Sequence, residues 1–113
     1  MSAVIHPDGT LGKYAFGVAG DDLIEKTDSG VVLEGYKIPS YQETIDTVKR
    51  LHYNLPFFNL IGWDMAICED GIPLLVEWNQ RPGPSQTACG TGFGKYTERI
   101  IKEVKDKKNT QII

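Results

Sequence analysis

The stretch from Ile61 to Gly83 constrains the fold of this chain most, because it has the pattern of a β-hairpin. Two apolar-rich runs flank Asp70-Gly71, a dipeptide typical of the two-residue turn between antiparallel strands. Counting back from that turn places Asp64 directly opposite Glu77. Because side chains alternate between the two faces of a strand, Asn79 lies on the same face as Glu77. The pattern therefore gathers two carboxylates and one amide on one patch of sheet.

Two facing carboxylates on such a patch point to a bound cation. Like charges directly opposite one another destabilise a sheet, so Asp64 and Glu77 require a compensating positive charge. Mg²⁺ is the economical candidate, because this hard ion is held by one or two carboxylates together with substrate phosphates. By the same alternation, Leu60, Ala66 and Leu75 border the patch. We therefore predict a magnesium site on this face, with the two acids and the neighbouring amide as ligands.

The residues alone leave two alternatives open. The acids could point to solvent, since half-buried antiparallel strands normally carry polar side chains on their outer face. The turn could instead comprise Glu69-Asp70-Gly71 with a bulge, and a one-residue shift reverses the face of every side chain. Pro73 lacks an amide hydrogen, so it fits only an edge or a position without a ladder hydrogen bond. Each of these alternatives keeps the hairpin, but the three-residue turn would change the register of its strands.

The rest of the chain predicts an α+β fold with a mostly antiparallel sheet and two main helices. Strand-like runs separated by turn signals occur at 3–5, 14–18 and 31–33. Ser40 and Glu43 have the spacing of a capping box, so the first helix is expected to begin there. It should end near Asn54, because Pro56 disfavours its continuation.

Both predicted helices are amphipathic. The first carries its apolar stripe, at helical spacing, on Tyr41, Ile45, Val48 and Leu51. The second is expected to begin between Phe93 and Tyr96, and its stripe comprises Ile100, Ile101 and Val104. Lysines crowd its later half, where they suit the negative end of a helix, and we interpret them as a solvated face.

Composition indicates one ordinary globular domain. The chain has 113 residues, of which 41% are hydrophobic and 24% charged. Its net charge of −3 offers no general attraction to nucleic acid or to an anionic membrane. No apolar run reaches the length of a membrane span and no signal-peptide pattern occurs, so the cytoplasm is the expected location. Cys68 and Cys89 lack metal-binding spacing.

Residues along the chain also resemble the ATP-grasp superfamily. Asp64, a step of thirteen residues to Glu77, and then Asn79 fall where that superfamily keeps its magnesium ligands. Gly62-Trp63-Asp64 resembles in particular the branch called sugar-transfer-associated ATP-grasp. Further matching pieces occur in the same order, namely residues 35–39 (GYKIP), Gln86 and residues 92–94 (GFG). The similarity extends from about Pro7 to Val104.

The resemblance implies a fold like the C-terminal subdomain of ATP-grasp proteins over residues 1–106, followed by a polar tail at 107–113. It implies ATP and Mg²⁺ as cofactors, with Ala66, Val76 and Arg81 at the nucleotide and a small-molecule or sugar-linked substrate. The implied activity is ATP-dependent ligation or phosphoryl transfer in the biosynthesis of cell-surface polysaccharide or a peptide conjugate. Gly62 stands where many ATP-grasp ligases carry arginine, which weakens the transfer of a carboxylate–amine ligase mechanism.

Arg81 is the predicted catalytic residue. Its guanidinium follows Asn79 by two residues and could reach the nucleotide phosphates or a transferring phosphoryl group, with a surface salt bridge as the alternative.

The family's nucleotide site also uses lysines and a hinge strand from a preceding half-domain, of which this chain holds no copy. We therefore expect a C-terminal portion that is inactive or weak alone, completed by that half-domain or by homodimerisation. A non-catalytic remnant that acts as a binding or interaction module is the alternative.

Overall fold

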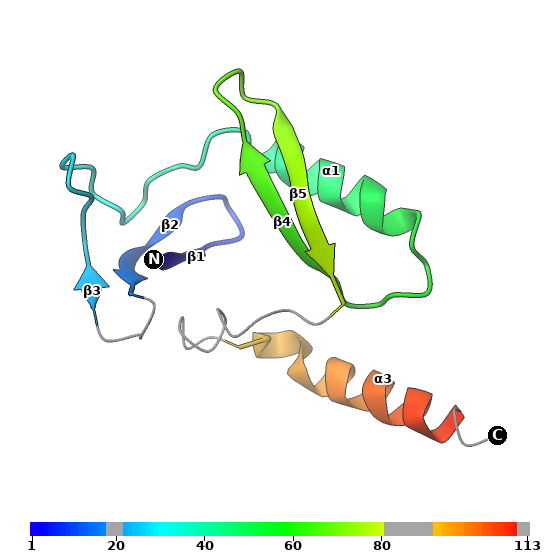
Figure 1. Ribbon diagram of the computed structural model, residues 1–113. Helices are drawn as coiled ribbons and strands as arrows, with labels where there is room; N and C mark the ends of the chain where they lie inside the picture. The colour runs from blue at the N-terminus through cyan, green and yellow to red at the C-terminus, as the bar shows by residue number, and fades with distance from the viewer. Residues whose placement is uncertain (18–21, 81–91, 111–113) are drawn as a thin grey trace.

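The computed structural model describes residues 1–17, 22–80 and 92–110, with the side chains of 108–110 excluded. The elements in chain order are β1 (Ser2–Ile5), β2 (Leu11–Phe16), β3 (Leu23–Ile24), α1 (Tyr41–Tyr53), β4 (Gly62–Ile67), β5 (Pro73–Asn79), the short 3₁₀ helix η1 (Gly94–Tyr96) and α3 (Thr97–Thr110) (Figure 1). The strands form two small antiparallel sheets, β1-β2-β3 and β4-β5. Two small antiparallel sheets and two main helices confirm the predicted α+β class.

The N-terminal sheet is built around β2. Ala3 pairs with Ala15 on one side of this strand, and Ala15 pairs with Ile24 on the other. The strand formed by Leu23 and Ile24 was not predicted from the sequence. The first expected strand is confirmed by β1, and β2 contains residues 14–16 of the second but ends before Gly17.

The strand predicted at 31–33 is wrong. Val32 forms an isolated bridge with Lys26, and the Leu33 amide donates to the Glu25 carbonyl at 3.0 Å. The Tyr36 amide then donates to the Leu33 carbonyl at 2.9 Å, so the chain turns again immediately. Turns on both sides of this apolar run leave no length for a ladder.

Helix α1 begins and ends where predicted, but it is not capped as predicted. Ser40 has a φ of 52° in the left-handed region and its side chain makes no capping hydrogen bond. Side-chain capping needs an extended backbone at this position, so the expected capping box with Glu43 does not form. The Ser40 carbonyl instead accepts hydrogen bonds from the Thr44 amide at 2.9 Å and the Thr44 hydroxyl at 2.8 Å.

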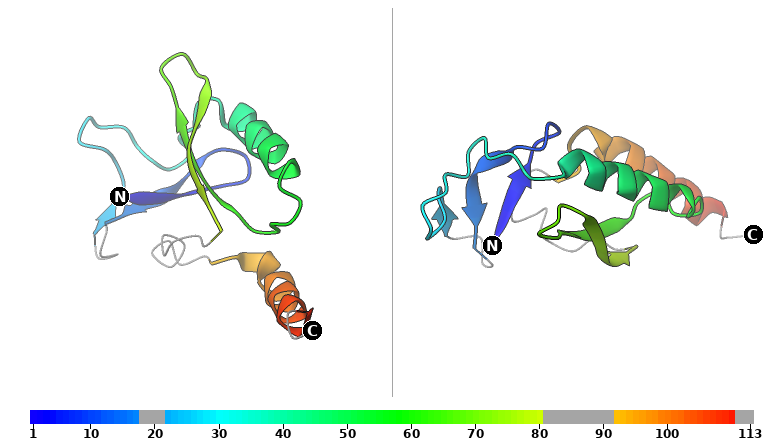
Figure 2. Two further views of the ribbon diagram at one scale, coloured as in Figure 1. Left: turned by 45° about the vertical axis from the view of Figure 1, so that its right-hand side comes forward. Right: turned by 90° about the horizontal axis from the view of Figure 1, so that it is seen from above.

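Tyr41, the first residue of α1, ties the helix to the N-terminal sheet. Its ring lies against the backbone of Gly9, and a Cβ added to Gly9 would stand 2.7 Å from Tyr41 Cδ1. Gly9 has a φ of 84°, and its carbonyl accepts a hydrogen bond from the Ile38 amide at 3.0 Å. The predicted apolar stripe of α1 faces inward, but its side chains are only half-buried. Seen from above, α1 and the β4–β5 hairpin form two layers (Figure 2).

Helix α3 extends away from the hairpin (Figure 1). The short helix η1 begins at Gly94, inside the predicted range, and α3 follows at Thr97, one residue after that range. Helix α3 continues to Thr110, so residues 107–110 of the expected polar tail are helical. Ile101 and Val104 of its predicted stripe remain 49% and 51% exposed. Among the described residues, no helix is both long enough and apolar enough to span a bilayer.

The hydrophobic core is small for a chain of this size. In the described part of the chain, the hydrophobic residues that are buried are Ala15, Leu33 and Ile61. The accessible surface is 8954 Å², whereas a compact monomer of 12.6 kDa is expected to expose about 6,200 Å². The radius of gyration is 16.4 Å, against about 13 Å for a compact domain of this length. Large hydrophobic side chains are accordingly left uncovered, among them Tyr53 and Phe57.

Candidate functional site

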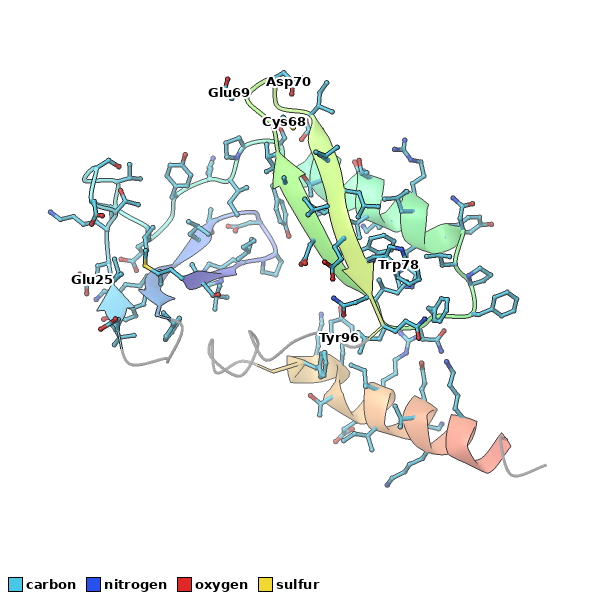
Figure 3. The ribbon with its side chains drawn as sticks, viewed as in Figure 1. Glu25, Cys68, Glu69, Asp70, Trp78 and Tyr96 are labelled. Carbon is cyan, nitrogen blue, oxygen red and sulfur yellow. The ribbon has the colours of Figure 1, made fainter. Side chains whose placement is uncertain are left out.

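The turn of the hairpin contains three residues, not two. The Gly71 amide donates to the Cys68 carbonyl at 2.8 Å, and the Cys68 amide donates to the Ile72 carbonyl at 3.1 Å. Gly71 adopts a φ of 79°, and the Asp70 carboxylate accepts a hydrogen bond from the Ile72 amide at 2.9 Å. The predicted two-residue turn is therefore wrong, and the alternative turn of Glu69, Asp70 and Gly71 is the one that forms (Figure 3). A three-residue loop closed by a left-handed glycine is a common hairpin connection.

A bulge in β5 compensates for the longer turn. Met65 pairs with Leu75 on the turn side, whereas Asp64 pairs with Glu77 on the far side. Val76 is thus an extra residue in β5, at the point where the register shifts. The two one-residue shifts cancel, so the predicted pairing of Asp64 with Glu77 is confirmed although the predicted turn is not.

The bulge also decides which side chains share a face. Leu75 lies opposite Met65, on the face away from the two acids, so its predicted place beside them is wrong. Leu74 lies opposite Ala66 and takes that place. The prediction assumed unbroken alternation along β5, and alternation fails where a bulge adds a residue.

The face away from the acids carries the two tryptophans and is closed by α1. Trp63 and Trp78 pair across the hairpin with ring centroids 6.3 Å apart. The Trp63 ring lies 6.0 Å from His52 of α1, and the Trp78 ring lies 5.8 Å from Phe58. His52 Nε2 lies 2.6 Å from the Phe58 carbonyl oxygen, which fixes the loop after α1. The prediction that both tryptophans face away from the metal patch is confirmed.

The opposite face carries the predicted metal ligands. Asp64 and Glu77 are exposed, and Asn79 is half-buried and pairs with Gly62. Side chains directly opposite in an antiparallel pair have Cβ atoms about 4.5–5.5 Å apart, which is close enough for two carboxylates to share one ion. The Asn79 Oδ1 atom is buried and accepts no hydrogen bond from the residues that the structure describes. A buried acceptor without a donor is unfavourable, and a cation would satisfy it.

These three side chains fit Mg²⁺ by their chemistry. The ion prefers oxygen ligands and is commonly held by one or two carboxylates, with phosphates and water completing its shell. In the described segments, no three or more His, Cys, Asp or Glu side chains gather into a cluster that could hold a metal by itself. Two carboxylates and one amide therefore suit an ion that arrives with a phosphorylated ligand.

The residues predicted at the nucleotide are only partly placed. Ala66 is half-buried on the face of the acids, and Val76 is 64% exposed at the bulge. Arg81 lies outside the described residues, as do Gln86 and Cys89. The roles of Ala66, Val76 and Arg81 remain predictions.

The sequence did not reveal how α3 is held against the loop before β4. Glu103 accepts hydrogen bonds from Arg99 Nε at 2.9 Å and from Asn59 Nδ2 at 2.8 Å. The hydrogen bond from Arg99, followed in size of effect by the one from Asn59, holds the pKa of the Glu103 carboxyl below its ordinary value. The spacing of Arg99 and Glu103 on one helix face is a readable signal, whereas nothing in the sequence singles out Asn59.

A cavity of about 320 Å³ lies between α3 and the loop before β4. Gln80, which directly follows β5, is among its lining residues, as are Phe58, Leu60 and Ile100. The end of β5 therefore adjoins a space that α3 only partly fills.

The fold and the hairpin agree with the class of nucleotide-dependent proteins that the sequence resembles. An antiparallel hairpin that carries facing acids and a following amide, with a helix behind it, has the arrangement expected for the magnesium end of an ATP-grasp fold. The family model for sugar-transfer associated ATP-grasp matches residues 2–102, and the chain belongs to this family. Membership implies the use of ATP and Mg²⁺ in general, and it confirms the resemblance drawn from the sequence. No curated protein and no solved structure matches the chain.

Proposed function

We propose that this chain is the magnesium-binding, C-terminal portion of an ATP-grasp enzyme. The enzyme would carry out ATP-dependent ligation or phosphoryl transfer in the biosynthesis of cell-surface polysaccharide or a peptide conjugate, in the cytoplasm. One observation carries the proposal: Asp64 lies directly opposite Glu77, on the face that α1 leaves open. Membership of the sugar-transfer associated family supports the link to sugar-linked substrates.

The proposed roles follow from the chemistry of each side chain. Asp64 and Glu77 hold the ion through their carboxylates, and Asn79 contributes its amide oxygen. When bound, Mg²⁺ neutralises phosphate charge during transfer of the phosphoryl group. Ala66 and Val76 contact the nucleotide through apolar surface, and Arg81 neutralises phosphate charge.

A complete nucleotide site needs further protein on the open side of the hairpin. We propose that a preceding half-domain of the same enzyme, or a second copy of this chain, covers the open surface and supplies the lysines of the site. The support is the accessible surface of 8954 Å², which exceeds the expected value for a compact monomer by about 2,700 Å². A standard protein interface buries about 800 Å² on each partner, so the excess is ample.

Calorimetry with Mg·ATP and Mg·ADP tests the metal role. We expect Asp64→Asn and Glu77→Gln each to weaken binding by about tenfold or more, because each removes a charged ligand of the ion. Glu69→Gln is the matched control, since this exposed acid of the same hairpin lies in the turn and outside the pair. Equal binding by the parent and both site variants would refute the role of the two acids.

The second candidate is a non-catalytic module whose retained acids serve only the fold. The exposed apolar side chains favour it, because such surface marks sites of protein association. Tyr53 and Phe57 are 87% and 84% exposed at the end of α1 and in the following loop. A chain that self-associates in sedimentation experiments, and that takes up no Mg·ATP either alone or joined to a preceding half-domain, would support this candidate over the enzyme.

A further inference from the structure

We propose that the bulge at Val76 is a positioning element, which aims the Glu77 carboxylate at the ion that it shares with Asp64. This inference rests on the proposed function and extends it to a residue whose contribution comes through the backbone. Val76 is a positioning residue in this sense, because it acts through its neighbour Glu77.

With Val76 present, the bulge keeps the acids opposite each other, but a strand one residue shorter would do the same without a bulge. Without Val76, β5 would alternate regularly and would still place Glu77 opposite Asp64 and Leu75 opposite Met65. The three-residue turn is likewise closed by its own hydrogen bonds between Cys68 and Ile72. Neither the turn nor the pairing therefore explains the extra residue.

The bulge is also not required by the packing of the hairpin on α1. Without Val76, Leu75 and Trp78 would still share the face that meets the helix, because they would stand two positions apart. Val76 itself is 64% exposed, so its side chain contributes little to the core. A bulge leaves one residue outside the ladder, and such a feature needs a reason beyond the fold.

The position of the bulge supplies the reason. It lies immediately before Glu77 and opposite the step from Asp64 to Met65, where the register shifts. A bulge bends the strand and increases its local twist, which re-aims the adjacent side chain, and such bulges are common next to active sites. In a regular ladder the two carboxylates would stand side by side as a repelling pair. The altered direction of Glu77 lets them converge on one ion.

Two variants separate the backbone effect from the side chain. Deletion of Val76 removes the bulge but keeps every other pair of the hairpin, whereas Val76→Ala keeps the bulge and shortens the side chain. The probe is Mn²⁺ alone, whose paramagnetism broadens the amide NMR signals of nearby residues even when binding is weak. Trp63 and Trp78 report the fold independently through fluorescence, because they lie on the opposite face.

In the parent chain we expect Mn²⁺ to broaden the signals around Asp64 and Glu77 and to leave those of Glu69 sharp. The deletion should keep the tryptophan emission and the melting temperature but weaken Mn²⁺ binding about tenfold or more, the size typical of residues that orient metal ligands. Because Mn²⁺ is added without nucleotide, the apolar contact proposed for the Val76 side chain plays no part, and Val76→Ala should stay within about twofold of the parent for binding of the metal alone.

Four results would overturn the inference. Unchanged Mn²⁺ affinity in the deletion variant would show that the bulge does not orient the Glu77 carboxylate. An equal loss of Mn²⁺ affinity in Val76→Ala would assign the loss to the side chain. Unfolding of the deletion variant would make Val76 a structural residue. A parent chain whose signals Mn²⁺ does not broaden at Asp64 and Glu77 would instead refute the proposed metal site itself, and the inference with it.

Discussion

Replacement of Gly9 by alanine is the sharpest test of how the N-terminal sheet joins α1. Gly9 has a φ of 84°, a conformation that costs an alanine about 1–2 kcal/mol. The added Cβ would also stand 2.7 Å from Cδ1 and 2.8 Å from Cγ of the Tyr41 ring. Because real Cβ atoms do not approach other atoms so closely, the ring must move, and such overpacking costs about 1–3 kcal/mol. The total expected loss is about 2–5 kcal/mol.

Gly30→Ala is the matched control. Gly30 has a φ of 87°, almost the same as Gly9, but no atom lies within 4 Å of its added Cβ. Its substitution should therefore cost only the conformational part, about 1–2 kcal/mol. Urea denaturation followed by circular dichroism measures the free energy of unfolding of both variants.

A double-mutant cycle isolates the contact. In a Tyr41→Ala background the ring is absent and only the contact with the Tyr41 Cβ, at 3.0 Å, remains, so the cost of Gly9→Ala should fall most of the way to that of Gly30→Ala. Equal losses for Gly9→Ala and Gly30→Ala in the parent chain would refute the reasoning, because the clash with Tyr41 would then contribute nothing.

Three further predictions follow from the site and from α3. Without metal, Asp64→Asn should raise the free energy of unfolding by roughly 0.2–1 kcal/mol, because it removes the like-charge pair, and thermal melts in EDTA measure this. The pKa of Glu103 is lowered in the folded chain, so its contacts with Arg99 and Asn59 should be intact above the ordinary carboxyl pKa and lost as the pH falls through the lowered value. The NMR signals of the Asn59 side-chain amide measure this transition, and Glu103→Gln should abolish it. Sedimentation velocity should show self-association of the parent chain, and Phe57→Ser should weaken it, whereas a strictly monomeric parent would exclude the second copy as partner.

The hairpin and its acid pair were predictable because their signals are local and redundant. Asp64 and Glu77 are equally far from the Asp70-Gly71 turn signal. Trp63 and Trp78 are their neighbours in the sequence, so strand alternation places the tryptophans on the opposite face. The turn length was not predictable in the same way. Asp70-Gly71 suits a two-residue turn, but the Asp70 carboxylate bonds the Ile72 amide and extends the loop by one residue.

Other parts of the fold escaped prediction because they depend on contacts distant in the sequence. Ser40 has the right residue type and spacing for a cap, yet its left-handed backbone prevents one. The short strand β3 exists only because β2 offers it an edge. The contact of Asn59 with Glu103 joins residues 44 positions apart, which no local pattern encodes.

The hairpin is braced against α1 at both ends, and this has a mechanical consequence. At its tip, Ser40 Oγ lies within 3.1 Å of where a Cβ on Gly71 would stand, and at its base Trp78 packs on Phe58, after the helix. Helix α1 and the hairpin should therefore move together as one rigid body, and Asp64 and Glu77 should move with it. Any closure around a nucleotide would then have to leave this body intact and hinge outside it.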